Sequence, residues 1–473
     1  MKRRVLIIGA GSAGRMIAEE LSENGEEYNR EVIAFLDDDP ALLGKSILGK
    51  SVAGTSDEVQ RFVRELAIDE IVIAIPSGLG SVVRRLISLA QKARVPVRIV
   101  PGVRDIIEGT VSFEQVREIA PEDLLGRETV TLEKGPIRQV VEGREVLITG
   151  AGGSIGSEIC RQIVSFRPSR LWLLGRGENS LFEIEEELRE GMGYRDSRAV
   201  LADVRDMDRL KFLAKDLKPE VIVHAAAHKH VPFMEIYPEE AVMVNVVGTA
   251  NLLRFCEMVG ASRFVMLSTD KAVHPRSVMG STKRIAEFLV QCAAKRNHAC
   301  YMAVRFGNVL GSRGSVVPIF QRQLRRGGPL TVTDKRASRY FMTIKEAAML
   351  VVQAMAGGQG GEIFILDMGE AIKIYELARN VIALAGLTED DGIEIVETGL
   401  RPGEKLEEVY LATTERTEPG PHSQILSARP EIPRGFAADT VVEELRSLAL
   451  AGDRKGIRRR LAEWIPDHDD SSD

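Results

Sequence analysis

The chain has 473 residues, of which 44% are hydrophobic and 28% are charged, and its formal net charge is −6. This balance is typical of a globular protein rather than a disordered or membrane-embedded one, and we expect no apolar run long enough to span a bilayer. No block of Lys and Arg marks a nucleic-acid-binding face, so we expect no nucleic-acid partner. A chain of this length exceeds what one hydrophobic core organises, which predicts two domains or a domain with a lobe.

The first 100 residues alternate β-like apolar runs with segments of helical periodicity, which predicts parallel βαβ units and a first Rossmann-like domain at residues 1–120. The predicted strands are residues 5–8, 32–36, 71–75 and 97–100. Gly9, Gly11 and Gly14 follow the first strand, and acidic residues 37–39 stand about 23 residues later, close to the spacing of a dinucleotide site. A second cofactor site is one interpretation of this domain.

A less regular stretch, residues 121–143, is predicted to be a linker with a short hairpin or helix. The second domain then covers residues 144–465, with strands from residue 146 and at 171–174, 221–224, 264–268 and 302–306. Beyond Gly311 shorter elements predict a substrate-binding lobe, mainly residues 311–440, and the acidic residues 466–473 are expected to be a frayed tail. The predicted fold class is α/β, with two doubly wound Rossmann-like domains in tandem.

The four cysteines, at positions 160, 256, 292 and 300, have no paired metal-ligand spacing, so we predict no metal site. Nothing points to secretion, which favours reduced thiols in a cytoplasmic protein or in the cytosolic part of a membrane-anchored parent.

A glycine-rich loop opens the second domain between a strand and a helix, in the sequence VLITGAGGSIG at 146–156. Glycines at such spacing let the backbone approach a pyrophosphate, whose charge the helix N-terminus stabilises. The alternative is a turn that serves packing alone. The candidate cofactor-binding residues of this loop are Gly150, Gly153, Ser154, Ile155 and Gly156.

The end of the next strand decides between NAD and NADP. An acid that binds the ribose hydroxyls of NAD is expected about 20 residues after the glycines, and this chain has Gly175 there, followed by Arg176. A guanidinium can bind a 2′-phosphate, so we favour NADP over NAD. The alternative is a solvent-facing Arg176 with Glu178 in the sugar-binding role.

Residues 268–283 read STDKAVHPRSVMGSTK and form the candidate catalytic segment. Because Ser268 ends a predicted strand, Thr269, Asp270 and Lys271 are expected at the carboxyl edge of the sheet, where such folds bind ligands. An Asp beside a Lys is usually an exposed pair of little energetic value, but this location favours a functional pair. Lys283 lies on the following predicted helix, four residues after Met279.

These motifs resemble the extended short-chain dehydrogenase/reductase family, in particular the UDP-N-acetylglucosamine 4,6-dehydratases of polysaccharide biosynthesis. Their large members have Met where others have Tyr four residues before the Lys, as at Met279. The resemblance covers residues from about 5 to about 430 and includes the motifs at 305–318, 339–343 and 401–406. It implies further cofactor-binding residues: Asp203 and Val204, Ala225, Ala226 and Lys229, the helix-stabilising Asn245, and Lys283 on the nicotinamide ribose.

The resemblance also implies UDP-N-acetylglucosamine or a related UDP-sugar as substrate. Guanidinium groups are expected to bind the two phosphates of this substrate. Arg401 is the first candidate, followed by Arg339 and Arg313. The remaining substrate-binding candidates are Asn308, Val317 and Pro318 in the uridine region, with His230 and Glu404.

By resemblance, a tightly bound NADP or NAD takes a hydride from C4 of the sugar and returns it to C6. Lys271 removes the C5 proton, and Asp270 gives a proton to the departing C6 hydroxyl. Lys271 must then be neutral, which requires a lowered pKa, and Asp270 requires a raised one. Met279 cannot accept a proton, so the 4-hydroxyl proton leaves through Thr269, Lys283, water or the Asp270–Lys271 pair.

Three functions compete. The leading one is the dehydratase; the second is a UDP-sugar 4-epimerase, which shares the C4 oxidation but does not use an acid–base pair at C5 and C6. The third is a degenerate dehydrogenase, a scaffold that binds its cofactor without turnover, which Met279 suggests. The resemblance places the first domain after membrane helices in longer relatives, and we favour a structural, oligomerising or regulatory ligand role for it in a homo-oligomer.

Overall fold

The computed structural model describes residues 2–75, 80–100, 113, 116–125, 130, 132–387, 392–412 and 415–465. The chain divides into two compact units. The first consists of Met1–Thr131, Val316–Val332 and Tyr375–Val396, and the second of Leu132–Ser315, Thr333–Ile374 and Glu397–Asp473. The predicted acidic tail lies outside the described residues.

The main sheet of the first unit has the strand order β3-β4-β2-β1-β5-β6-β7 within the described residues. The four predicted strands are confirmed as β1 (Arg3–Ile8), β2 (Arg30–Leu36), β5 (Glu70–Ile73) and β6 (Val97–Ile99), all parallel. Three short strands complete the sheet: β3 (Ser46–Ile47), β4 (Lys50–Gly54) and β7 (Arg117–Glu118). The helices between them are α1 (Ser12–Glu23), α2 (Val59–Glu65) and α3 (Gly80–Gln91).

The second unit contains a nine-stranded sheet in the order β10-β9-β8-β11-β12-β13-β17-β21-β20, as far as the structure describes the chain. Its parallel strands are β8 (Glu145–Thr149), β9 (Arg170–Gly175), β10 (Ser197–Leu201), β11 (Val221–His224), β12 (Arg263–Leu267), β13 (Cys300–Arg305) and β17 (Ile363–Leu366). Strands β20 (Thr417–Pro419) and β21 (Ile425–Ala428) add an antiparallel edge. Because the strand order reverses between β8 and β11, the switch point at which such folds bind ligands lies there.

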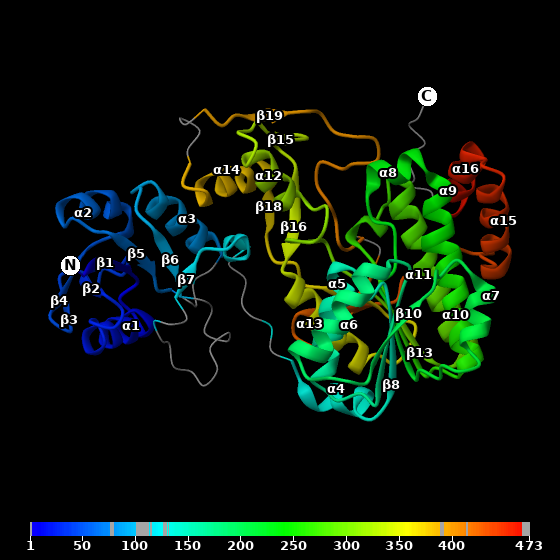
Figure 1. Cartoon of the computed structure of the whole chain (residues 1–473). Helices are drawn as coiled ribbons and strands as arrows, with labels where there is room; N and C mark the ends of the chain where they lie inside the picture. The colour runs from blue at the N-terminus through cyan, green and yellow to red at the C-terminus, as the bar shows by residue number, and fades with distance from the viewer. Residues whose placement is uncertain are drawn as a thin grey trace. The chain divides into compact units, whose positions relative to one another are not determined.

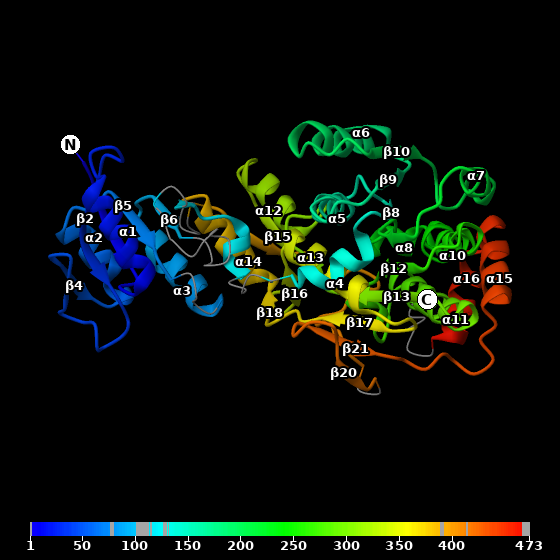
Figure 2. The same ribbon diagram turned by 90° about the horizontal axis from the view of Figure 1, so that it is seen from below.

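Helices cover both faces of this sheet. On one face α13 packs against α5 and α4, and on the other α10 packs against α7 and α11 (Figure 1, Figure 2). The bounds are α4 (Lys134–Val141), α5 (Ser154–Val164), α6 (Glu178–Glu186), α7 (Met207–Leu213), α8 (Val231–Ile236), α9 (Pro238–Ala241), α10 (Gly248–Val259), α11 (Val278–Asn297), α13 (Ile344–Gly357), α15 (Ala438–Leu450) and α16 (Arg454–Trp464). Helix α11 is mostly buried, and Ser277 caps its N-terminus, since its hydroxyl accepts a hydrogen bond from the Gly280 amide.

The predicted lobe at 311–440 is not one body. A small sheet of β14 (Asn308–Val309), β16 (Ser338–Met342) and β18 (Ala371–Lys373) belongs to the second unit. The first unit takes α12 (Val316–Leu324), β15 (Leu330–Val332), α14 (Ile374–Leu384) from Tyr375 on, and most of β19 (Ile395–Glu397), because β15 pairs with β19 rather than with the β16 sheet. The predicted linker contains helix α4, which belongs to the second unit.

One helical run bears on the expectation about apolar length. By length and composition alone, Pro238–Val259 could cross a membrane, although 72% of its most apolar window is buried inside the fold. Two of its polar side chains, Asn245 and Asn251, hold neighbouring loops through hydrogen bonds. We therefore interpret the run as a core helix of the second unit.

Candidate active site

The glycine loop after β8 forms a cradle that only small backbone positions allow. Gly150 has a φ of +66°, and a Cβ on it would lie 2.8 Å from the Ala226 amide nitrogen. A Cβ on Gly156 would lie 2.2 Å from the Gly150 carbonyl oxygen, so this glycine lets α5 pack against the loop. The loop, the N-terminus of α5 and the switch point together have the geometry that binds a pyrophosphate.

A cleft of about 370 Å³ lies beside this loop in the second unit. Seven predicted cofactor-binding residues line it: Gly150, Gly153, Arg176, Asp203, Val204, Ala225 and Ala226. The prediction missed other lining residues, among them Gly152, Ser180, His228 and Val244. Ser154 and Ile155 instead begin helix α5, and Glu178 is an exposed residue at the start of α6.

The rim of the cleft combines one acid with two guanidinium groups. Asp203 lies 2.9 Å from Arg205 Nη2 and 3.9 Å from Arg176 Nη1. Burial opposes the charge of Asp203, but the hydrogen bonds and the charge of Arg205 outweigh it and lower its pKa. Arg176, whose side chain is 59% exposed, keeps its guanidinium at the rim, where a phosphate could reach it.

The loop after β11 is held by Asn245, whose helix-stabilising role stays a prediction. Its Oδ1 accepts the His228 amide at 2.9 Å, and its Nδ2 donates to the His228 carbonyl at 3.0 Å and to Thr282 at 3.1 Å. Lys229, on the same loop, donates to Ser312 at 3.3 Å, and burial lowers its pKa. His230 caps α8 and lies against Gly314, where a Cβ would come within 2.7 Å of its ring.

The candidate catalytic segment lies where the sequence predicted. Strand β12 ends at Leu267, and Asp270 follows in a short 3₁₀ turn at the carboxyl edge of the sheet. Asp270 is fully buried, and its Oδ1 accepts hydrogen bonds from Thr269 Oγ1 at 2.9 Å and from Lys271 Nζ at 3.0 Å. Among the described residues, its Oδ2 has no hydrogen-bond partner. A buried free carboxylate oxygen is costly unless a ligand supplies a donor, so Oδ2 is a candidate acceptor for a bound ligand.

Lys271 is surrounded by oxygen atoms, which the sequence analysis did not foresee. Besides Asp270, its Nζ donates to Asn308 Oδ1 at 3.0 Å and lies 3.7 Å from Glu408 Oε1. Burial lowers the pKa of this amine, but Asp270 and Glu408 outweigh that effect and raise it. The protein alone therefore holds Lys271 as an ammonium, opposite to the shift that the proposed base requires.

Lys283 shows the lowered pKa instead. It is 5% exposed, and its Nζ donates to the Leu267 carbonyl at 2.6 Å. Burial is the main cause that lowers its pKa to about 8, with Glu287 acting in the opposite direction. Met279, one turn earlier on α11, is 2% exposed and belongs to the apolar core of the unit. The structure thus places Met279 as a packing residue. Only its place in the sequence, four residues before Lys283, supports the prediction that it belongs to the catalytic residues.

A buried cluster of ion pairs lies next to the start of the candidate catalytic segment. Arg305 is fully buried and binds Glu287 through two hydrogen bonds of 2.7 Å and Glu415 through bonds of 2.7 and 3.0 Å. Glu287 also accepts the Ser268 hydroxyl at 2.7 Å. The cluster fixes the end of β12 directly before Thr269, and sequence reasoning missed it because its members are far apart in the chain.

The predicted phosphate-binding arginines have different surroundings. Arg339 is 8% exposed and donates to the carbonyls of Ser338, Lys405 and Leu406 at 2.7 to 2.9 Å, so it ties β16 to the segment around 405. Arg401 is exposed and pairs loosely with Glu404 at 3.6 Å. Of the two, Arg401 keeps its guanidinium available for a phosphate.

Arg313 lies beside the glycine loop, and its role toward the substrate stays a prediction. It lines the cofactor cleft, and its amide donates to Ser154 Oγ at 3.0 Å. Of the uridine-region candidates, Asn308 lies beside Lys271, whereas Val317 and Pro318 belong to the first unit. Their role toward a uridine stays a prediction.

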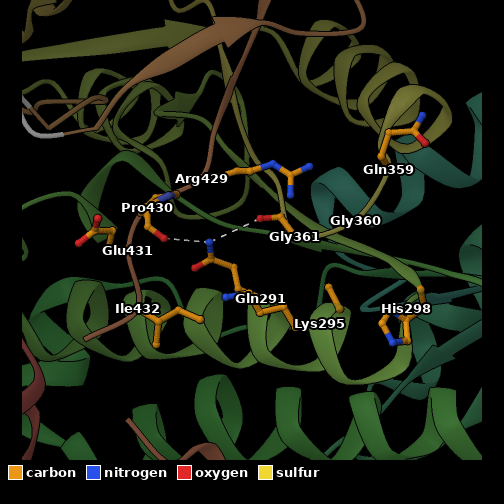
Figure 3. A pocket seen from close by; sticks show the side chains of 12 residues that line it. Gln291, Lys295, His298, Gln359, Gly360, Gly361, Arg429, Pro430, Glu431 and Ile432 are labelled. Atoms are coloured by element: carbon orange, nitrogen blue, oxygen red, sulfur yellow. Dashed lines mark hydrogen bonds between the residues drawn. The ribbon is translucent and has the colours of Figure 1, made fainter. Parts of the chain in front are cut away.

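A second hollow, of about 660 Å³, lies at the opposite edge of the same sheet (Figure 3). Its lining includes Ala299, directly before β13, and Gly360 and Gly361, shortly before β17. Gln291 on α11 points toward it and donates to the Pro430 carbonyl at 3.1 Å. Since folds of this kind bind ligands at the carboxyl ends of their strands, we assign the chemistry to the other edge.

Comparison with known proteins decides the family. Residues 146–430 match the family described as "Polysaccharide biosynthesis protein", and residues 1–101 match one described as "CoA-binding domain". This chain belongs to the polysaccharide biosynthesis protein family. The match confirms the predicted resemblance: the protein is an extended short-chain dehydrogenase/reductase of the dehydratase and epimerase type that serves polysaccharide biosynthesis.

Several relatives of this family are similar over most of their length. The "Probable polysaccharide biosynthesis protein EpsC" of Bacillus subtilis (strain 168) is 46% identical over 413 residues, which cover 87% of this chain and 69% of that protein. The "Capsular polysaccharide biosynthesis protein CapD" of Staphylococcus aureus is 41% identical, over 94% of this chain and 74% of that one. A "UDP-N-acetylglucosamine 4,6-dehydratase (inverting)" of Campylobacter jejuni (strain 81-176) is 32% identical, over 57% of this chain and 78% of that one.

Solved structures confirm the fold class. The structure of Pen from Bacillus thuringiensis has a TM-score of 0.57 and 33% identity, and the match covers 66% of this chain and 98% of that one.

Proposed function

We propose that the protein is a UDP-N-acetylglucosamine 4,6-dehydratase that forms a UDP-4-keto-6-deoxy sugar for the biosynthesis of a surface polysaccharide. The observation that carries the proposal is the Asp270–Lys271 pair, joined at 3.0 Å, at the edge of the sheet that also carries the cofactor cleft. Elimination across C5 and C6 requires a base and an acid close together, and this pair supplies both.

A nicotinamide dinucleotide fits the residues of the cleft. The cradle at Gly150 and Gly156 leaves room for a pyrophosphate, and Lys283 stands one turn after Met279 on α11, in the position that holds the nicotinamide ribose in the family. The cofactor, when bound, would accept a hydride from C4 and return it to C6. Arg176 at the rim, with Gly175 in place of an acid, supports NADP as the preferred form.

Three residues of this chain carry the protons of the proposed reaction: Thr269, Asp270 and Lys271. Thr269 Oγ1 donates to Asp270 Oδ1 at 2.9 Å, which gives the 4-hydroxyl proton a path to Asp270. Lys271 then takes the C5 proton, while Asp270 passes its proton to the C6 hydroxyl, which leaves as water. Lys271 finally returns its proton to C5. Because this path needs no tyrosine, position 279 can hold a methionine that serves packing.

Lys271 must be neutral when the substrate is bound, although Asp270 and Glu408 raise its pKa in the protein alone. Protonation of Asp270 by the 4-hydroxyl removes one of these two negative charges. Glu408 is then the one of these two carboxylates that keeps its charge, so the pKa of Lys271 falls. We therefore expect activity to rise with pH as Lys271 loses its proton.

A UDP-sugar 4-epimerase is the second candidate, because a "UDP-glucose 4-epimerase" of Rickettsia bellii (strain OSU 85-389) is 32% identical over 281 residues. Epimerisation does not use an acid–base pair at C5 and C6, so the Asp270–Lys271 pair favours dehydration. The same proposal includes a cytoplasmic location, because the free Cys160 and Cys256 suit a reducing compartment. It also includes a homo-oligomeric state.

Mass spectrometry of the protein incubated with UDP-N-acetylglucosamine and NADP or NAD tests the proposal. We expect a product lighter by one water. A product of unchanged mass with inverted C4 would identify an epimerase, and unchanged substrate with all candidate cofactors would contradict both enzyme functions.

A further inference from the structure

A second carboxylate, Glu408, lies next to the catalytic pair but outside the candidate catalytic segment. Its side chain is only 3% exposed. Its Oε1 lies 3.7 Å from Lys271 Nζ and 3.9 Å from Arg339 Nε, and its Oε2 lies 3.8 Å from Lys405 Nζ. Within the described residues, Oε2 has no hydrogen-bond partner.

The distances around Glu408 differ from those of a structural ion pair in the same unit. Glu287, equally buried, is bonded to Arg305 at 2.7 Å through each of its two oxygens. Glu408 instead faces three cations, each at 3.7 Å or more. A buried carboxylate without close bonds contributes little to stability, but its field acts strongly on nearby charges in a medium of low dielectric constant. The charge that it faces most closely is that of the proposed base.

We propose that Glu408 is a positioning residue of this site that stabilises the ammonium which Lys271 becomes when it takes the C5 proton. The inference rests on the proposed dehydratase function. In that step the C5–H bond breaks and an N–H bond forms on Lys271. The electron pair of the C5–H bond forms the C5–C6 double bond, the C6–O bond breaks, and the proton of Asp270 completes the water.

The groups that face Lys271 are Asp270, Asn308, Glu408 and, farther out, Arg339. Lys405 donates to the Val273 carbonyl at 2.8 Å, lies 3.8 Å from Oε2 of Glu408 and is also within reach of the charges of Asp270 and Lys271. Of these groups, Asp270 and Glu408 raise the pKa of Lys271, and Arg339 lowers it. Asp270 is neutralised when it takes up its proton, so Glu408 is the negative charge that remains beside Lys271 when the C5 proton moves.

The variant Glu408→Gln removes the charge and keeps the shape. We expect kcat to fall about 10- to 100-fold while KM changes less than about twofold, because the charge acts on the proton transfer rather than on binding. Loss of the negative charge lowers the pKa of Lys271, so the rising limb of the pH profile of kcat moves to lower pH. The kinetic isotope effect of substrate deuterated at C5 rises, because cleavage of the C5–H bond becomes slower.

Glu407→Gln is the matched control, since Glu407 is the exposed neighbour. It is expected to leave the pH profile and the isotope effect at their wild-type values. Glu408→Asp keeps the charge one methylene farther from Lys271 and is expected to give intermediate values, and it serves in place of Glu408→Gln if that variant does not fold.

An active wild-type enzyme whose Glu408 variants keep the wild-type pH limb and isotope effect would overturn the inference, even if kcat falls. Failure of the wild-type protein to release water would instead contradict the proposed function itself, so the two failures can be told apart.

Discussion

The two units begin in the same way and differ at the end of the second strand of each. In both, a buried strand leads into a glycine loop and a helix, and the last glycine packs on the first. A Cβ on Gly14 would lie 2.0 Å from the Gly9 carbonyl oxygen, and one on Gly156 would lie 2.2 Å from that of Gly150. In the first unit, Asp37 at the end of the next strand accepts the Ala10 amide of the loop at 2.6 Å. In the second, Gly175 and Arg176 stand there, and the loop borders an open cleft.

The same difference recurs in the charged pairs beyond the strands. Asp38 binds Arg85 at 3.0 Å in the first unit, as Asp270 binds Lys271 at 3.0 Å in the second. Asp38 is partly exposed and also bonds to Ser56, whereas Asp270 is fully buried and, among the residues that the structure describes, has one oxygen without a partner. A glycine loop and an ion pair therefore do not define an active site by themselves.

The largest expected effect separates the two ion pairs. Lys271→Met removes the proposed base and is expected to lower the rate of dehydration by about 10²- to 10⁴-fold, the usual contribution of acid–base catalysis. Asp38→Asn in the first unit is the matched control and is expected to retain the wild-type rate. Mass spectrometry of the released product measures the rate of dehydration in both variants. Equal losses of rate in the two variants would show that the two ion pairs do not differ in function.

The second comparison is between the glycine loops. Gly156→Ala is expected to weaken cofactor binding by about 10- to 100-fold, which corresponds to about 1.4–2.8 kcal/mol, because the new methyl group pushes α5 away from the loop. Gly14→Ala makes the same clash in the first unit and is expected to lower stability but leave NADP binding intact. Cofactor titration by fluorescence, with thermal melting of both variants, checks this. Loss of NADP binding in Gly14→Ala would place a cofactor in the first unit.

The third comparison concerns buried charge. Glu70 in the first unit is buried and bound by Arg30 at 2.6 Å, whereas Lys283 in the second donates to a carbonyl oxygen, and its pKa falls to about 8. An unfolded lysine has a pKa of about 10.4, so between these values the folded protein binds fewer protons than the unfolded chain. The free energy of unfolding should then rise with pH, by about 2 kcal/mol between pH of about 7.5 and about 9.5.

Urea denaturation at the two pH values measures this contribution as the difference between the wild-type protein and Lys283→Met, which lacks the titrating group. An identical pH dependence in both proteins would show that Lys283 keeps its ordinary pKa.

The smallest expected effect concerns cofactor choice. Arg176→Ala is expected to reduce the preference for NADP over NAD by about tenfold, since the exposed guanidinium loses one charge-assisted contact with a 2′-phosphate. Arg189→Ala, which removes an exposed arginine paired with Glu190, is the control. Binding constants for NADP and NAD in each variant measure the change in preference. A preference for NAD in the wild-type protein would show that a residue other than Arg176 binds the adenosine ribose.

Local patterns predicted those features that depend on local structure. The apolar runs gave both main sheets, because buried parallel strands are short and continuously apolar. Thr269, Asp270 and Lys271 were predictable because they directly follow a strand. Glu408 was not, since it comes from a segment 137 residues after Lys271 with no strand or helix pattern of its own. The contact of the Arg313 amide with Ser154 was not predictable either, because the two residues are 159 positions apart.

The most direct test uses UDP-N-acetylglucosamine that carries deuterium on C4. A dehydratase of the proposed kind must move this label within the sugar, since the hydrogen taken from C4 returns at C6. We predict a product that is lighter by one water and carries the deuterium on C6, as determined by mass spectrometry and NMR. A product of unchanged mass with the label still on C4, or a dehydrated product without label on C6, would contradict the account.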